Sequence, residues 1–257
     1  MMLSFNELVG RLKQIKKEGY VKTHRSGDTG IGKTLEDLLG IDENNVPSPN
    51  AHMIELKSAR KKGSSMLTLF TKSPLPEKAN SVLLETFGYE SAKGNKKKEL
   101  HTTVKSNSFN TLKGKDGFKI DIKGDRIELV TKGKPIKGSV SSLMKRLLGK
   151  ENKQRIVLGY WTKETLKNSF ERKLPELLYV KAESKGKGSN EEFWFNEAWL
   201  LSGFDFANFL RLVDEGTICV DIRIGQYPDG RPHDHGTGFR VHPDKLDLCF
   251  ENRKNLI

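Results

Sequence analysis

The chain contains 257 residues, of which 35% are hydrophobic, and its 45 lysines and arginines against 33 aspartates and glutamates give a formal net charge of +12. This length and apolar content are enough for one large domain or two tightly joined lobes. They exclude a helical membrane protein, because no apolar run is long enough to cross a bilayer. Residues 1–10 lack the basic and apolar regions of a signal peptide, so we expect a cytoplasmic protein that makes no contact with membranes.

The positive charge is distributed over several segments and is not confined to one tail. Basic residues cluster at 60–62, 93–98, 132–137 and 185–187. A folded surface of this kind most commonly binds a polyanion such as nucleic acid, although charge alone leaves open that these lysines only solvate loops. The two cysteines, Cys219 and Cys249, lie among apolar residues, which is typical of buried thiols in a reducing compartment.

Hydrophobic periodicity predicts both helices and strands along the chain. Ser4 followed by Glu7 is a capping-box signature, and the apolar residues behind it recur at helical spacing, which predicts a helix over 4–17. Further helices are expected at 35–39, 140–148 and 204–213. Strands are expected at 53–58, 66–71, 117–122, 126–131, 155–161, 177–183 and 217–224. Strands with helices interspersed indicate an α/β or α+β fold.

Residues 27–34, Gly-Asp-Thr-Gly-Ile-Gly-Lys-Thr, match the phosphate-binding pattern of nucleotide hydrolases letter for letter. That motif works only between a buried parallel strand and a helix, and the preceding residues 20–26 are mostly polar. Nucleotide hydrolysis stays open as an alternative, but we expect no nucleotide cofactor. We interpret the segment as a glycine-rich basic loop that approaches a DNA backbone closely, with Lys33 contacting a phosphate.

The strand expected at 53–58 carries an acid and a lysine two residues apart, Glu55 and Lys57. Residues i and i+2 of a strand point to the same face, so Ile54 and Leu56 enter a core while Glu55 and Lys57 stand together on the other side. Such a pair suits phosphodiester hydrolysis, since the carboxylate holds a divalent cation and the ammonium positions the attacking water. The alternative is a half-exposed strand with charged residues for solubility.

A second polar cluster lies near the C-terminus, where Arg223 on a strand is followed by His233, Asp234, His235 and Arg240. Arginine forks onto guanine O6 and N7, and aspartate accepts from cytosine N4, so these side chains are suited to reading base edges. Two other interpretations remain open. The histidines could bind zinc, although their spacing fits no familiar zinc pattern, or the cluster could be a polar surface turn.

Short segments spread over nearly the whole chain occur in an order that matches one protein family. They lie at 29–39, 54–57, 67–74, 118–122, 220–225 and 233–237. In this order they resemble the MvaI/BcnI family of type II restriction endonucleases, most closely its MvaI-like branch. That family is related to the mismatch-repair nickase MutH and belongs to the PD-(D/E)xK nucleases.

The resemblance implies a PD-(D/E)xK restriction-endonuclease-like core in a single bilobed nuclease over 1–257, with a DNA cleft. Catalytic elements are expected mainly in 1–125 and base-recognition elements mainly in 200–245. It also implies a monomer that uses Mg²⁺ to cut double-stranded DNA at a CC(N)GG-type site, with CCWGG favoured, one strand at a time. A cognate DNA methyltransferase would be its functional partner. A MutH-like strand-specific nickase and a catalytically silent sequence-specific DNA-binding protein are the alternatives.

Individual residues carry over from the family by position. Glu55 and Lys57 match its E-x-K motif, and Glu36 matches an acidic position near the active site. The segment holding His233, Asp234, His235 and Arg240 matches the one that contributes to base recognition, and Arg223 matches a basic position on the strand before it. Lys33 and Lys72 are expected to contact DNA phosphates.

One position departs from the family pattern. The family has an aspartate five residues before the glutamate, whereas this chain has Asn50, which keeps the shape of a metal ligand but loses its charge. Asn50 and Glu55 are the expected metal ligands, so magnesium affinity and turnover should be lower than with aspartate. Three explanations of Asn50 remain open. We favour an engineered change from aspartate, made to trap a DNA complex. The alternatives are a naturally weakened enzyme, or another carboxylate, such as Asp42 or Glu43, in the role of the missing aspartate.

Overall fold

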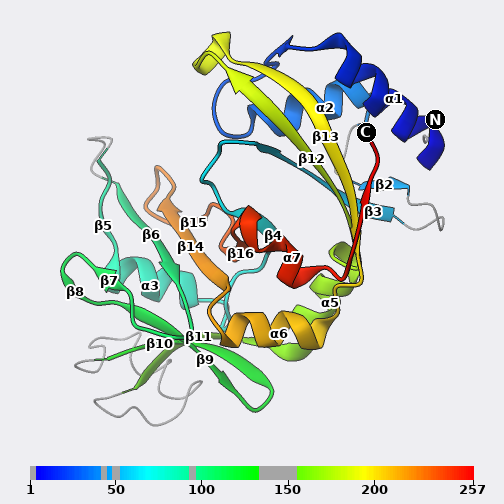
Figure 1. Ribbon diagram of the computed structural model, residues 1–257. Coiled ribbons are helices and arrows are strands. Elements are labelled where there is room, and N and C mark those ends of the chain that lie inside the picture. Colours follow the sequence, from blue (N-terminus) through cyan, green and yellow to red (C-terminus); the bar gives the residue numbers. More distant parts are fainter. Residues whose placement is uncertain (1–3, 42–44, 48–52, 93–96, 133–154) are drawn as a thin grey trace. The chain divides into compact units, whose positions relative to one another are not determined.

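The computed structural model describes residues 4–41, 45–47, 53–92, 97–132 and 155–257, and it has a mixed α+β fold (Figure 1). The chain divides into two compact units. Unit 1 consists of Met1–Leu67, Glu171–Asp205 and Leu246–Ile257, and unit 2 consists of Thr68–Phe170 and Phe206–Lys245. Each unit is therefore assembled from segments that are distant in the sequence.

Unit 1 is built on one sheet. Among the described residues its strand order is β1 (Val21–Lys22), β13 (Glu192–Ser202), β12 (Glu176–Lys185), β3 (Met53–Arg60) and β2 (Asn45–Pro47), with β17 (Asn252–Asn255) also pairing β13. The pairing of β12 with β3 is parallel, and the other pairs are antiparallel. Two helices, α1 (Phe5–Glu18) and α2 (Gly30–Leu39), contact β13 and β3 respectively, and a short helix, α7 (Leu246–Cys249), also belongs to this unit.

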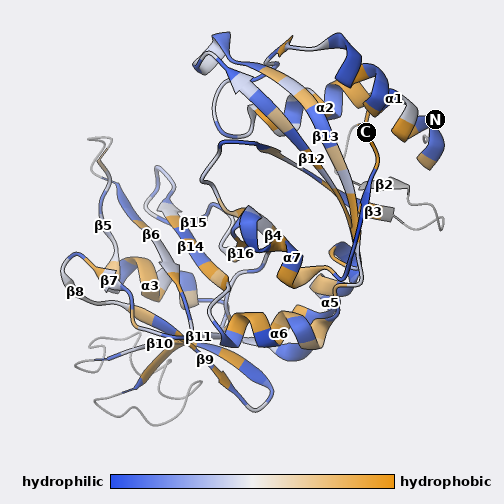
Figure 2. Cartoon of the chain, viewed as in Figure 1, coloured by the Kyte–Doolittle hydropathy of each residue, from blue (hydrophilic) through white to orange (hydrophobic). Residues whose placement is uncertain are grey.

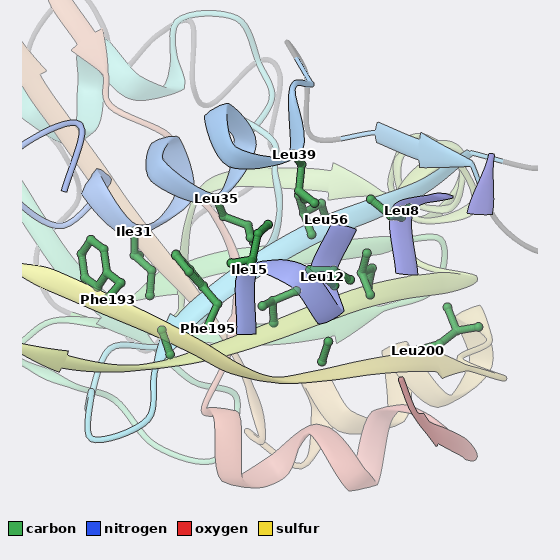
Figure 3. Close-up of a cluster of buried hydrophobic side chains, with 14 of the residues drawn as sticks. Leu8, Leu12, Ile15, Ile31, Leu35, Leu39, Leu56, Phe193, Phe195 and Leu200 are labelled. Carbon is green, nitrogen blue, oxygen red and sulfur yellow. The ribbon is translucent and has the colours of Figure 1, made fainter. Parts of the chain in front are cut away.

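The core of unit 1 lies between this sheet and the two long helices (Figure 3). α1 contributes buried leucines and an isoleucine at helical spacing, which is the amphipathic pattern expected for residues 4–17. The predicted capping box is present, because the Ser4 side chain accepts from the Glu7 amide and the Glu7 carboxylate accepts from the Ser4 amide. These features fix α1 on one face of the sheet and leave the opposite face for the polar residues of β3.

Unit 2 contains the remaining sheets. The largest has the order β4 (Leu67–Thr71), β16 (Gly238–Val241), β14 (Ile218–Gln226), β6 (Lys98–Val104) and β5 (Tyr89–Glu90), with β15 (Pro232–Asp234) also on β14. A second sheet has the order β11 (Ile156–Thr162), β10 (Arg126–Thr131) and β9 (Phe118–Lys123), and a small hairpin joins β7 (Thr111–Leu112) to β8 (Lys115–Asp116). Among the described residues its helices are α3 (Ala79–Phe87) and α6 (Phe206–Asp214), and α5 (Lys163–Lys173) begins in unit 2 and ends in unit 1.

Hydrophilic and hydrophobic residues lie next to each other along β14 (Figure 2). On β14, Val220, Ile222 and Ile224 are buried apolar residues, whereas Asp221 and Arg223 alternate with them. Buried aromatic residues fill the core of unit 2, and neighbouring rings contact one another, as between Phe209 and Phe239. One face of this sheet therefore supplies the core, and the other carries polar side chains.

The expected elements are largely present. Each strand predicted from the sequence exists, and the helices expected at 4–17 and 204–213 are α1 and α6. The helix expected at 35–39 begins earlier, at Gly30, and the one expected at 140–148 lies outside the described residues. Cys219 and Cys249 are both buried thiols, as predicted. Within the described part of the chain, no helix is long and apolar enough to span a membrane.

Candidate active site and recognition cluster

β3 divides its side chains between the two faces of its sheet as the sequence predicts. Ile54 and Leu56 are buried in the core beneath α1 and α2. Glu55 and Lys57 point to the opposite face, where the parallel neighbour β12 places Leu177 beside Glu55 and Tyr179 beside Lys57. Only 2% of the Glu55 surface is exposed, which makes it one of the few buried carboxylates in the described residues.

Two ammonium groups surround the buried carboxylate. Lys57 Nζ lies 2.6 Å from Glu55 Oε1, and Lys173 Nζ lies 3.4 Å and 3.3 Å from Oε1 and Oε2. Burying a carboxylate without a counter-charge is strongly unfavourable, and these two cations provide that counter-charge. Two positive charges face one negative charge, and the surplus suits an anionic ligand such as a phosphate.

The sequence did not point to Lys173. It is the last residue of α5, and only Leu174 and Pro175 separate it from the first residue of β12. Because β12 pairs in parallel with β3, this short connection brings the end of α5 next to Glu55. Lys173 can thus be recognised as a site residue only from the tertiary structure, because its position depends on the parallel pairing of two strands that are far apart in the sequence.

Glu36 of α2 and Lys57 of β3 line the same cavity, which has a volume of about 300 Å³. The other lining residues are Arg25, Asp28, Thr29, Ile31, Gly32, Lys33, Leu35, Leu56 and Ser58. Burial raises the pKa of the Glu36 carboxyl, although nearby Lys33 acts in the opposite direction. The structure therefore brings the acid predicted on this helix to the same hollow as the lysine of the E-x-K pair.

The glycine-rich segment at 27–34 has no buried parallel strand before it. The preceding strand, β1, has two residues and pairs antiparallel with β13. Its glycines serve the turn into α2: Gly27 has a positive φ of 89°, and a Cβ on Gly30 would lie 2.1 Å from the Arg25 carbonyl oxygen. Lys33 donates to Asp37 over 2.7 Å, and this hydrogen bond raises the Lys33 pKa.

Asn50, Asp42 and Glu43 lie outside the described residues. Among the residues that are described, no group of three His, Cys, Asp or Glu side chains is arranged to hold a metal ion. Glu55 is nevertheless a carboxylate ligand of the kind that magnesium prefers, and magnesium sites commonly use one or two carboxylates together with substrate phosphates and water. The donor chemistry at Glu55 thus fits a divalent cation bound jointly with DNA.

The arginines of the predicted recognition cluster meet at Asp221 on the polar face of the sheet in unit 2. In this sheet β14 lies between β16 and β6. Asp221 is 1% exposed, and its Oδ2 accepts from Arg223 Nε over 2.7 Å. Arg240 Nε lies 3.2 Å from the same oxygen as an ion pair, although its N–H is not directed along a hydrogen bond. Thr103 donates to the other oxygen over 2.7 Å.

His233 and His235 form part of an aromatic row on β15 and the turn after it. The Tyr227 and His233 rings stack with centroids 4.2 Å apart, and those of His233 and His235 are also 4.2 Å apart. His235 packs directly on Gly225, because a Cβ there would lie 2.3 Å from His235 Nε2. The structure thus groups the two predicted histidines, and a glycine makes the space for one of them.

Asp234 makes four hydrogen bonds within the protein. Its Oδ1 accepts from the amides of Gly236 and Thr237 over 2.9 and 2.6 Å, and its Oδ2 accepts from Ser73 Oγ and Asn80 Nδ2 over 2.6 and 3.0 Å. A carboxylate has about four acceptor sites, and here all are occupied. Asp234 therefore holds the loop, and no free acceptor remains for a cytosine edge in this structure.

Lys72 follows β4 and has a fixed backbone. Its amide donates to the Thr237 carbonyl over 2.9 Å, and its own carbonyl accepts from Trp161 Nε1 over 2.9 Å. The Thr237 contact ties Lys72 to the turn that follows His235. A phosphate contact by Lys72 would therefore lie next to the recognition cluster of unit 2.

Comparisons with known proteins agree on one family. The family model described as the MvaI/BcnI restriction endonuclease family matches residues 9–250. A solved structure described as the complex of restriction endonuclease MvaI with a cognate DNA substrate is 33% identical, with a TM-score of 0.77 and coverage of 98% of both chains. MvaI in the absence of DNA is 30% identical, with a TM-score of 0.55 and coverage of 100% of this chain and 99% of that one. None of the curated protein sequences compared with the chain matches it.

Proposed function

Because the chain belongs to the MvaI/BcnI restriction endonuclease family and is a site-specific deoxyribonuclease, we propose that it cuts double-stranded DNA at a CC(N)GG-type site, with CCWGG favoured. We further propose that it acts as a monomer and nicks one strand at a time. A cognate DNA methyltransferase is its functional partner, since an enzyme that cuts a short site requires protection of the host DNA.

The observation that carries the proposal is the buried Glu55 between Lys57 and Lys173. A carboxylate with only 2% of its surface exposed, paired at 2.6 Å with the lysine two residues along the strand, has the composition of a PD-(D/E)xK catalytic centre. The non-catalytic interpretation, a solvated Glu–Lys pair on an exposed strand, does not explain this burial. The second lysine, from α5, adds the positive charge that a phosphodiester requires.

Enzymes of this family use a divalent metal ion, and we propose magnesium. Glu55 and the residue at position 50 would hold it, together with an oxygen of the DNA. When bound, the ion supplies charge stabilisation for the pentavalent transition state and the leaving 3′ oxygen. Glu36 lines the cavity beside Lys57, where burial raises its pKa.

The lysines have separate tasks in this scheme. Lys57 orients the attacking water through its ammonium hydrogens, because it is fixed by the Glu55 carboxylate. Lys173 donates to a nonbridging oxygen of the scissile phosphate, where negative charge increases in the transition state. Lys33 and Lys72 contact phosphates away from the cleavage position, which contributes affinity but not specificity.

Sequence recognition is assigned to unit 2. Arg223, Arg240, His233 and His235 present donors suited to the G·C edges of the major groove, where each base pair has a distinct pattern. Asp234 supports them indirectly, since its four hydrogen bonds hold the turn that follows β15. This division gives the catalytic strand to unit 1 and the base contacts to unit 2.

Incubation of a supercoiled plasmid carrying CCWGG sites with magnesium tests this proposal, using the parent chain and its Asn50→Asp variant. We expect linear fragments with ends at the site, produced through a nicked intermediate and faster with aspartate. Nicked circles alone would favour a MutH-like nickase. An unchanged plasmid with both proteins, together with site-specific binding, would favour a catalytically silent DNA-binding protein.

A further inference from the structure

The polar face of β14 contains a buried carboxylate to which sequence reasoning gave no role. Asp221 lies at the centre of a three-strand arrangement in which Thr103 of β6 is its direct partner on one side and Gly238 of β16 on the other. Arg223 follows two residues later on the same face, and Arg240 is two residues beyond Gly238. The sheet register therefore directs two arginines and one hydroxyl toward a single carboxylate.

The way in which the arginines approach this carboxylate is informative. Both come to Asp221 Oδ2 through Nε, at 2.7 Å for Arg223 and 3.2 Å for Arg240. Within the described residues, neither arginine donates a hydrogen bond to the protein from Nη1 or Nη2. Arg223 is held at Nε by a hydrogen bond and Arg240 by an ion pair alone, so both keep their Nη donors for another planar acceptor. Guanine presents O6 and N7 in that geometry.

The charges of the cluster lead to the same conclusion. One carboxylate faces two guanidiniums, so one positive charge remains uncompensated. Arg240 has only 20% of its side-chain surface exposed, and a cation this buried is costly unless a counter-ion stabilises it. Asp221 supplies that stabilisation for both arginines while Thr103 fixes the other carboxylate oxygen.

We propose that Asp221 is a positioning residue for sequence recognition, which orients Arg223 and Arg240 through their Nε atoms so that their Nη edges face guanine. The inference rests on the proposed function, because it requires that these arginines read bases. It goes beyond that function by placing the control of specificity on a residue that is too buried to touch DNA itself.

Asp221→Asn separates this role from a merely structural one. Loss of the carboxylate frees both guanidiniums to move, so affinity for a duplex carrying CCAGG should fall by about tenfold or more. The same change adds one positive charge, so affinity for a duplex of permuted sequence should stay equal or increase slightly. A general loss of structure would instead weaken binding to both duplexes.

The experiment measures binding of the full chain to the two duplexes at fixed salt, with calcium in place of magnesium. Asp121→Asn is the matched control, because Asp121 pairs with Arg155 in the same unit and is not assigned to DNA. In an Arg223→Ala/Arg240→Ala background, Asp221→Asn should cause no further loss of discrimination, since its effect passes through those two residues. Thr103→Val, which keeps the charge but removes one hydrogen bond, should reduce discrimination by a smaller factor.

Retained discrimination in both Asp221→Asn and Thr103→Val would overturn the inference, as would an equal effect of Asp221→Asn with and without the two arginines. A parent chain that binds the two duplexes equally would contradict the proposed recognition function itself, and the inference would fail with it. Selective loss on the CCAGG duplex, absent from the arginine-free background, is the result that supports it.

Discussion

At the scale of single residues, the site is governed by the cost of burying Glu55. Its carboxylate is almost completely removed from water, and its neutralisation depends on Lys57 and Lys173. Removing one partner of a buried ion pair leaves charge uncompensated, which is far more costly than losing a surface pair. Loss of the ion pair between Lys173 and Glu55 should therefore affect both the stability of the fold and the rate of DNA cleavage.

Replacement of Lys173 by alanine should lower the rate of DNA cleavage by roughly 10²-fold, because a donor to the developing phosphate charge is lost. Affinity for DNA should change by no more than about tenfold, since contacts outside the site dominate binding. Lys167→Ala removes the same charge from an exposed position on the same helix and should leave the rate unchanged. Single-turnover cleavage of a labelled duplex measures both variants, and equal rates for Lys173→Ala and the parent would refute the assigned role.

Asn50→Asp should raise magnesium-dependent cleavage by orders of magnitude, because a hard divalent cation gains much of its binding from carboxylate charge. Calorimetric titration of magnesium in the presence of DNA should also show tighter binding. Asn255→Asp, which adds the same charge on the exposed strand β17, is the control and should do neither. If Asn50→Asp leaves rate and affinity unchanged, another acid holds the metal.

At the scale of elements, two short segments place the functional residues. The turn into α2 brings Glu36 and Lys33 to the cavity beside Lys57, and the loop after β15 brings His235 over Gly225. The backbone conformation depends on Gly30 in the first segment and on the hydrogen bonds of Asp234 in the second. The effects of substitutions in these segments on the free energy of unfolding are therefore predictable from local geometry.

Gly30→Ala and Gly32→Ala form a matched pair at the start of α2. A Cβ at Gly30 would lie 2.1 Å from a backbone oxygen, so Gly30→Ala should lower the free energy of unfolding by about 1–3 kcal/mol. A Cβ at Gly32 would meet nothing nearer than Ser58 Oγ at 3.8 Å, and alanine favours helix by up to about 1 kcal/mol. Urea unfolding distinguishes them, and an equal loss in both would contradict the role given to Gly30.

Asp234→Asn should destabilise the protein in a pH-dependent way. Burial alone would raise the Asp234 pKa, but hydrogen bonds from Ser73, Thr237, Gly236 and Asn80 outweigh it and hold the pKa below 3.8. A depressed carboxyl pKa stabilises the folded state above the unfolded pKa, and this contribution is lost as pH falls through the folded value. The expected loss at neutral pH is about 1.5–3 kcal/mol.

Urea unfolding of parent and Asp234→Asn from neutral pH to below 3.8 tests this expectation. The difference in unfolding free energy between the two should be largest near neutral pH and shrink at the acidic end. Asp229→Asn, an exposed aspartate before the same β15 strand, provides the control and should change stability little. A difference that grows on acidification would show that the carboxylate of Asp234 is not the stabilising form.

At the scale of the whole molecule, much of the catalytic strand was predictable because its pattern is local. Alternation alone placed Glu55 and Lys57 on the face opposite Ile54 and Leu56, as the structure has them. β13 was not predicted, because its alternation of buried residues breaks near Asn196, where the register with β12 shifts. A bulge of this kind depends on the partner strand, which periodicity in one segment does not reveal.

The functional residues likewise divide into those that a local sequence pattern predicts and those that depend on tertiary contacts. Lys173 meets Glu55 only when β12 pairs with β3, so no spacing in the sequence identifies it. Spacing places Asp221 beside Arg223 on one strand, but its contacts with Thr103 and Arg240 form only when β6 and β16 pair with β14. For Asp234, residue type suited a base contact, and the structure adds four hydrogen bonds within the loop that the sequence does not reveal. Residue type thus predicted the class of chemistry, and tertiary contacts determined which side chains have free donors and acceptors.

We place Glu55 of β3 at the centre of the proposed magnesium-dependent, site-specific DNA cleavage. The most direct test of this assignment compares cleavage of a CCAGG duplex and a permuted duplex by Asn50→Asp and by Asn50→Asp/Glu55→Ala, with magnesium. We expect the single variant to cut only the CCAGG duplex, and the double variant to bind that duplex with an affinity within about tenfold but not cut it. Cleavage by the double variant at a rate near that of the single variant would contradict the account.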